Sequence, residues 1–189
     1  MDAAVWVIEL VLLILPAYFA NSVPVLLGGG APIDNGKKWR DGQRLFGDGK
    51  TVRGFFVGVA AAVAVGALEG IFLAGGAYDI YGGAGSLAGS SWAGGAAIYV
   101  LAGFLLGLGT MAGDLLGSFI KRRQGIARGK QSVILDQLMF LAVALILAYP
   151  IAAPVLSPAA VIFLFVLTYF VHAGANVVAN RLGLKKVPW

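Results

Sequence analysis

Cysteine is absent from this 189-residue chain, histidine occurs once, and charged residues are scarce at 12% of the sequence. The lack of cysteine excludes disulfides and thiolate-ligated metals. Soluble domains carry about 25% charged residues, whereas here 59% of residues are hydrophobic and the mean hydropathy is +0.87. This apolar excess exceeds what one core can bury, which predicts an integral membrane protein in a lipid bilayer. The net charge of +5 does not indicate a nucleic-acid partner, because the cations lie between apolar runs.

Five apolar runs approach the roughly 20 residues that a membrane-spanning helix needs. We expect one all-α transmembrane domain covering residues 1–189, a bundle of about five helices. Pro150, Pro154, Ser157 and Pro158 separate the last two runs. The first run lacks a basic leader and a clear cleavage site, so we interpret it as a retained helix. The predicted spans are 3–27, 55–74, 93–120, 133–149 and 158–180.

All 14 lysines and arginines fall in three segments, which are 28–54, 121–132 and 181–189. Basic loops stay in the cytoplasm, so we expect these segments there, with the N-terminus outside and the C-terminus inside. An odd number of spans requires the same arrangement. The basic segments are short, and we expect them to pack together beneath the bundle. The segment 75–92 is rich in Gly, Ser and Ala, which is typical of a flexible outer connector.

Two aspartates lie at the cytoplasmic ends of predicted spans. Asp114 precedes the basic segment 121–132, and Asp136 follows it. Either each carboxylate is neutralised by a nearby Lys or Arg, or the pair binds Mg²⁺, which prefers oxygen ligands and bridges carboxylates to phosphates. Spacing alone leaves both interpretations open. Glu9 and Glu69 fall toward the outer ends of their spans, where we expect interfacial exposure or a helix contact.

The helix around Asp114 carries a polar stripe. Asp114, Ser118 and Lys121 are spaced i, i+4 and i+7, so they share one helix face, with Arg122 beside them. The stripe offers a metal ligand, a hydroxyl and cations for phosphate. Gly109, Gly113 and Gly117 occupy an adjacent face, and their spacing predicts close helix packing.

A second polar stripe lies on the last span, where His172, Asn176 and Asn180 are four residues apart. The histidine is either a general base or, as we prefer, a hydrogen-bonded contact between helices. Asn180 and Asn21, near the end of the first span, match the depth of Asp114. We expect both to line the same pocket.

The segment 28–54 combines eight glycines, six cations and three aspartates. Glycine lets backbone amides approach an anion, and Lys or Arg completes the charge match. The run Gly47-Asp48-Gly49-Lys50-Thr51 is not a P-loop, because Arg44 stands where the first glycine belongs. A loop that binds lipid headgroups is the alternative, but it needs neither the glycines nor the aspartates.

These motifs resemble a known enzyme family. The run from Gly113-Asp114 through Gly117-Ser118 to Lys121-Arg122, followed by Leu135-Asp136, resembles the signature of membrane CTP:phosphatidate cytidylyltransferases. Lys50-Thr51-Val52-Arg53-Gly54 resembles their Lys-Thr-x-Glu-Gly element, with Arg53 replacing Glu. The segment 32–54 is similar to the archaeal branch, the CDP-archaeol synthases. The chain departs from the bacterial pattern at Gln137, where Arg is usual, and lacks the Pro-Gly-His-Gly-Gly stretch.

The resemblance implies an Mg²⁺-dependent transfer of a cytidylyl group from CTP to an unsaturated archaeal diether lipid phosphate. It implies a multi-pass protein of the cell membrane with a cytoplasmic active site. Asp114 and Asp136 would hold one or two Mg²⁺ ions beside Lys121. Lys50, Arg53, Lys121 and Arg122 would bind phosphate, with Ser118, Asn21 and Asn180 nearby. The nucleotide site would be shaped by Asp34, Asp41, Arg44 and Thr51.

Other functions remain open at this stage. A related enzyme could use another lipid phosphate. A small transporter would need polar residues through the full membrane depth and often has internal repeats. A lipid-binding scaffold would need the cations but not Asp114 and Asp136.

Overall fold

The computed structural model describes residues 2–74, 76, 80–81, 92–126, 132, 135–136 and 138–183. Over these residues the chain is helical, with isolated bridges in place of strands. The predicted all-α membrane fold is confirmed. Four helices are long and apolar enough to cross a membrane. The helices are α1 (Ala3–Leu27), α2 (Val52–Leu73), α4 (Trp92–Arg123), α6 (Met139–Ala152) and α7 (Pro158–Arg181).

The helix α6 covers the later part of the fourth predicted span and extends three residues beyond it. We expected 133–149, whereas α6 comprises Met139–Ala152 and is 14 residues long. At about 1.5 Å per residue it reaches roughly 21 Å, which is less than a hydrocarbon core of about 30 Å. Ahead of α6, Leu135 and Asp136 are helical too, and the Asp136 amide donates to the Ser132 carbonyl at 2.8 Å. Residues 133, 134 and 137 lie outside the described residues. Pro158 begins α7 directly after Ser157, whose hydroxyl accepts from the Ala160 amide, as the break signal predicted.

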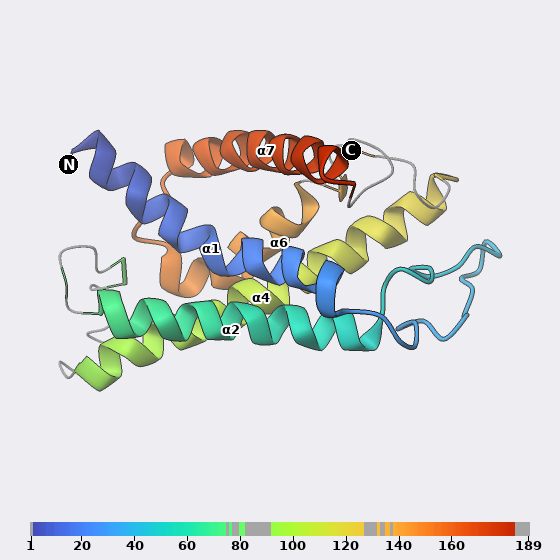
Figure 1. Cartoon of the computed structure of the whole chain (residues 1–189), viewed down its shortest axis with the longest axis horizontal. Helices are drawn as coiled ribbons and strands as arrows, with labels where there is room; N and C mark the ends of the chain where they lie inside the picture. Colours follow the sequence, from blue (N-terminus) through green and yellow to red (C-terminus); the bar gives the residue numbers. More distant parts are fainter. Residues whose placement is uncertain are drawn as a thin grey trace.

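Successive helices alternate in direction along the long axis (Figure 1). The start of α1 and the end of α7 lie at opposite ends of the molecule. The loop 28–51 and the last turns of α4 lie at the same end as the end of α7. The inside or outside position of each end stays a prediction. Arg128, Lys130, Lys185, Lys186 and most of the connector 75–92 lie outside the described residues.

Small residues bring the helix backbones into contact. A Cβ atom added to Gly66 of α2 would lie 2.3 Å from the Tyr99 carbonyl of α4. On the other side of α4, a Cβ on Gly109 would lie 2.5 Å from Ala144 Cα, and one on Gly113 2.7 Å from Phe140 Cα. Gly117 meets the Leu135 carbonyl in the same way. The predicted close packing is confirmed, and it seats α6 directly against the site-bearing end of α4.

Helix α7 is attached more sparsely. The Tyr18 hydroxyl and Thr168 Oγ1 are 2.9 Å apart between α1 and α7. The His172 ring lies 5.1 Å from the Phe140 ring and 6.3 Å from that of Tyr18, which agrees with a contact between helices. Large apolar side chains elsewhere on α7 are exposed, as lipid-facing residues would be; they include Ile162, Val166, Phe170 and Val178.

Glu69 is buried between helices rather than exposed at an interface. This residue of α2 is 7% exposed, and its Oε1 atom has no hydrogen-bond partner among the described residues. Of the two interpretations offered for Glu69, the helix contact is the one that the structure bears out. Glu9 is half-buried on α1.

Candidate active site

The loop 28–51 is a folded excursion between α1 and α2. Its two arms meet where the Ile33 amide donates to the Lys50 carbonyl at 2.8 Å, and where Val52 donates to Ala31 at 3.0 Å. Near its tip, the Trp39 amide donates to the Gln43 carbonyl at 2.8 Å. Gly42 and Gly47 have φ of 76° and 94°, a region that L side chains rarely adopt. The glycines therefore set the turns of this loop.

Asp34 is the centre of the loop. It is 3% exposed, and its two oxygens accept from Nε and Nη2 of Arg44 at 3.2 and 2.5 Å. The amides of Phe46, Gly47 and Gly36 donate to the same carboxylate at 3.0, 2.9 and 3.2 Å. The Arg44 guanidinium and these amides hold the pKa of Asp34 well below its usual range, against the opposing effect of burial. The predicted role of Asp34 in shaping the site thus has a physical basis, because its carboxylate organises the loop from within.

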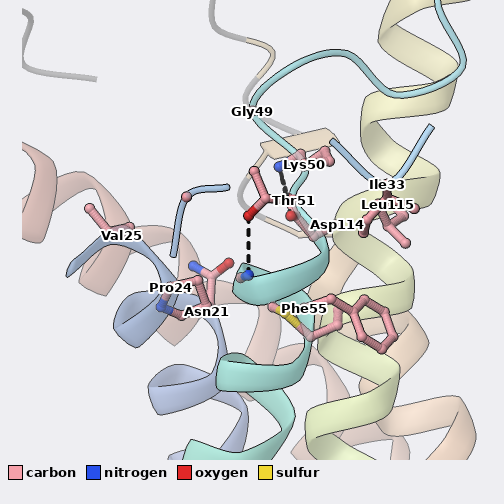
Figure 2. A pocket seen from close by; sticks show the side chains of 13 residues that line it. Asn21, Pro24, Val25, Ile33, Gly49, Lys50, Thr51, Phe55, Asp114 and Leu115 are labelled. Carbon is pink, nitrogen blue, oxygen red and sulfur yellow. Dashed lines mark hydrogen bonds and ion pairs between the residues drawn. The ribbon is translucent and has the colours of Figure 1, made fainter. Parts of the chain in front are cut away.

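Lys50 joins the loop to α4. Its Nζ lies 2.6 Å from both Asp114 oxygens, a contact visible in Figure 2. The next residue, Thr51, caps α2, and its Oγ1 accepts from the Gly54 amide at 3.1 Å. The cap fixes where α2 begins and therefore where Lys50 leaves the helix end.

A second lysine and aspartate pair lies further along α4. Lys121 Nζ is 2.8 Å from both oxygens of Asp136, which also accepts from the Ser132 amide at 2.9 Å. The residue Lys121 is only 8% exposed. The side chains of Asp114 and Asp136 are 33% and 37% exposed. Both carboxylates are therefore paired with lysine and still accessible.

Two pockets open at this end of the molecule. The first, which we call the α1–α2–α4 pocket, has a volume of about 280 Å³ and places Asn21, Lys50, Thr51 and Asp114 beside apolar Val25 and Phe55 (Figure 2). The second, the loop pocket, measures about 310 Å³. Its polar lining comprises Gln43, Arg44, Asp48, Lys50, Ser118, Lys121, Arg122 and Asp136. Gly49 and Lys50 line both pockets, so the two adjoin.

Most of the predicted site residues thus gather in two adjoining pockets, and four do not line them. Asp34 is buried within the loop, and Asp41 forms an ion pair with Arg123 at 2.7 Å. Arg53 is exposed at the start of α2. Asn180 is half-buried near the end of α7 and is not in the lining of either pocket.

Asp114 and Asp136 are the accessible carboxylates of these pockets, and each is paired with a lysine through both oxygens. Among the described residues, no group of three or more acidic or histidine side chains could hold a metal. Mg²⁺ is usually bound by one or two carboxylates together with substrate phosphates and water, not by a full protein cage. Asp114 lines the α1–α2–α4 pocket and Asp136 lines the loop pocket, so each would offer carboxylate oxygens to an ion bound with substrate phosphate.

Sequence reasoning missed the residues that hold the loop against α4. Arg123 donates to Asp41 and to the Arg44 carbonyl, at 2.7 Å in both cases. Phe119 packs near Trp39 and Phe46. These partners are about 80 residues apart in the chain, so no local pattern indicates them.

Comparison with known proteins identifies relatives over nearly the whole chain. A family model described as CarS-like, CDP-archaeol synthase, matches residues 4–189. CDP-archaeol synthase of Pyrococcus horikoshii is 49% identical over 176 residues, covering 93% of each chain. That of Methanococcus aeolicus is 43% identical over 184 residues, covering 97% of each. A solved structure described as "Structural insight into an intramembrane enzyme for archaeal membrane lipids biosynthesis" matches with TM-score 0.70 and 34% identity, covering 88% of this chain and 92% of that one.

Proposed function

Because this chain belongs to the CDP-archaeol synthase family, we propose that it transfers the cytidylyl group of CTP to the phosphate of an unsaturated archaeal diether lipid. The products are CDP-archaeol and pyrophosphate. The chain is accordingly a multi-pass membrane cytidylyltransferase.

The observation that carries the site assignment is the pair of adjoining pockets, each edged by a lysine–aspartate pair. A transferase must hold a donor and an acceptor side by side. The loop pocket is lined by four cations, which are Arg44, Lys50, Lys121 and Arg122. The α1–α2–α4 pocket has one cation, Lys50, and most of its other side chains are apolar. Lys50 lies between the two pockets, where the two reacting phosphates would meet.

The loop pocket suits CTP. Arg44, Lys121 and Arg122 supply cations for the triphosphate, and Ser118 supplies a hydroxyl. Arg122 Nε is buried and has no hydrogen-bond partner among the described residues, so a phosphate oxygen would satisfy it. Arginine and lysine together match the several negative oxygens of a triphosphate.

The α1–α2–α4 pocket suits the lipid phosphate. Asn21, Lys50 and Thr51 surround a space whose other walls are apolar, including Val25, Phe55 and Leu115. Exposed apolar side chains continue from this pocket along the outer faces of α1 and α2 toward the bilayer; they include Val25, Leu26, Val52 and Phe56. The headgroup can therefore enter while the isoprenoid chains stay in lipid.

The reaction joins two anions, and charge is its main obstacle. An oxygen of the lipid phosphate attacks the α-phosphorus of CTP, and the bond from that phosphorus to the bridging oxygen breaks to release pyrophosphate. The attacking phosphate is already ionised at neutral pH, so this chain needs no strong general base. Asp114 and Asp136 would hold one or two Mg²⁺ ions, which would screen the phosphates. Lys50 and Lys121 stabilise the charge that develops on the leaving group.

We place this site on the cytoplasmic side. The positive-inside rule assigns the basic loop 28–51 and the basic end of α4 to the cytoplasm. That is the compartment from which CTP would reach the loop pocket.

The test is incorporation of labelled CTP into vesicles that contain the unsaturated diether phosphate, with the purified protein and Mg²⁺. We expect Asp114→Asn and Asp136→Asn each to lower turnover by at least about a hundredfold, since each would weaken the binding of the metal ion that screens the reacting phosphates. Glu9→Gln, an isosteric change at the opposite end of α1, serves as the matched control and should retain activity. Normal turnover in both aspartate variants would reject the site, and no incorporation by the wild type would reject the function.

A further inference from the structure

Arg123, the last residue of α4, donates hydrogen bonds from its guanidinium to the loop 28–51. Its Nε donates to Asp41 Oδ2 at 2.7 Å, and its Nη2 donates to the carbonyls of Arg44 at 2.7 Å and Gln43 at 3.2 Å. One planar group thus ties the tip of the loop at three residues. Such a fork is specific to arginine, because lysine is a point charge on a flexible stem.

An aromatic platform supports the same contact. The Arg123 guanidinium lies 4.2 Å from the centre of the Phe119 ring, one turn earlier on α4. Trp39 meets the edge of Phe119 with ring centres 5.6 Å apart, and Phe46 lies 6.5 Å away. Trp39 and Phe46 flank the tip of the loop, so both sides of the tip rest on one turn of α4.

The residues tied down by Arg123 lead directly into the loop pocket. Gln43 and Arg44 line that pocket and are followed by Phe46, Gly47, Asp48, Gly49 and Lys50, which line it as well. The other wall comes from α4 through Ser118, Lys121 and Arg122. The pocket therefore exists only while the loop stays against α4. Arg123 itself does not line it, since its side chain faces the loop tip.

We propose that Arg123 is a positioning residue for nucleotide binding, which clamps the loop 28–51 onto α4 and thereby builds the loop pocket. The inference rests on the proposed function, in which that pocket takes CTP. Arg123 does not touch the reacting phosphates. It sets the position of Arg44 and Lys50, so its loss weakens CTP binding more than it slows turnover once CTP is bound.

The experiment compares Arg123→Gln with the wild type by steady-state kinetics, CTP titration calorimetry and trypsin cleavage within the loop, with the cut sites identified by mass spectrometry. We expect the KM for CTP to rise roughly tenfold or more, because several charged hydrogen bonds are lost. The kcat should change by less than about threefold, since the positioning is restored when CTP saturates the site. Cleavage after Lys37, Lys38 or Arg44 should become faster.

Two further variants keep the inference testable if Arg123→Gln folds poorly. Asp41→Asn removes one partner and leaves the two carbonyls, so it should raise the KM by a smaller factor. The exchange of Asp41→Arg with Arg123→Asp restores the ion pair and should recover part of the loop protection. Arg40→Gln is the matched control, because Arg40 is an exposed loop cation that lines neither pocket. Its KM and its cleavage after Lys37, Lys38 and Arg44 should match the wild type.

Unchanged KM and cleavage in Arg123→Gln would overturn the clamp. A raised KM with unchanged cleavage would overturn it too, because Arg123 would then bind CTP directly. Cleavage is measured without substrate, so it still tests the clamp if the wild type transfers no cytidylyl group. Failure of the proposed function and failure of the inference are thus separate results.

Discussion

The helix bundle and the loop 28–51 are held together by different physics. Between α2, α4 and α6 the contacts are backbone against backbone, and glycines such as Gly66 and Gly109 leave no room for a Cβ atom. The loop instead depends on the buried Asp34 carboxylate, the Lys50–Asp114 ion pair and the contacts of Arg123 with Asp41, Gln43 and Arg44. Van der Waals packing in lipid is insensitive to salt and pH, whereas ion pairs are not.

The contrast explains how one small protein can have both a rigid frame and a site that substrates enter. The bundle fixes Asp114, Ser118 and Lys121 on one helix face, while the loop brings Arg44 and Lys50 to meet them. A frame built on glycine contacts has few alternative arrangements, because any shift creates clashes or voids. A loop held by polar contacts responds to salt and to the loss of single charged groups. We expect the two regions to fail separately.

Asp34→Asn should have the largest effect of the substitutions considered, and we expect it to destabilise the loop while the helix bundle stays folded. Five donors point at this carboxylate, and an amide would turn its NH₂ group toward some of them. Breaking a buried ion pair costs about 3–5 kcal/mol, and we expect about 3 kcal/mol because Arg44 is partly exposed. Hydrogen exchange of the loop amides should rise accordingly and CTP binding should fall, while the thermal midpoint of the bundle stays within a few degrees.

The comparison for this variant is Asp41→Asn in the same loop. Its carboxylate is 37% exposed, and exposed ion pairs contribute about 0–1 kcal/mol. Hydrogen exchange of the loop amides should therefore rise much less in Asp41→Asn than in Asp34→Asn. If Asp34→Asn unfolds the helices together with the loop, the two regions form one cooperative unit and are not stabilised independently.

Gly113→Ala should act on the bundle instead. The new methyl would lie 2.7 Å from the Met139 carbonyl and from Phe140 Cα, both of which are backbone atoms of α6. Overpacking of this kind costs about 1–3 kcal/mol, which should lower the thermal midpoint in detergent. Activity should fall as well, because α4 carries Lys121 and the turn before α6 carries its partner Asp136.

Gly174→Ala is the matched control for that substitution. Nothing lies within 4 Å of the added methyl on α7, and alanine favours a helix over glycine by about 1 kcal/mol. This variant should be as stable as the wild type or more so. Equal destabilisation by the two alanines would show that helical propensity, not packing against α6, decides the stability of the bundle.

Much of the bundle could be predicted because it follows from local patterns. Apolar length marked α1 to within a residue, Ser157 and Pro158 marked the start of α7, and the spacing of Gly109, Gly113 and Gly117 predicted a close contact. The start of the fourth span stays a prediction, because Leu135 and Asp136 are helical ahead of α6 and residues 133, 134 and 137 lie outside the described residues. The helix that packs against each row of glycines could not be predicted either. The spacing shows which face of the helix is in close contact but not which helix lies there.

The sequence predicted which residues line the site better than it predicted what those residues contact. Polar spacing on α4 indicated Asp114, Ser118 and Lys121, which line the pockets. It left open whether a lysine or a metal faces each carboxylate, and the structure shows lysines there. Depth alone grouped Asn180 with Asn21, although α7 is attached sparsely and Asn180 lines neither pocket. Arg123 carries no local signal, because its partners are fixed only by the path of the loop.

The smallest expected effect is that of pH on the loop between pH 8 and pH 5. Because the pKa of Asp34 is lowered in the folded loop, its contribution is complete above the unfolded value of about 4. That contribution is lost only as the pH falls below this value toward the folded pKa. The difference in loop hydrogen exchange between the wild type and Asp34→Asn should therefore be constant from pH 8 to 5 and shrink below about pH 4. A difference that shrinks near pH 6 would mean that another group controls the loop, and the one histidine, His172, lies on α7 away from it.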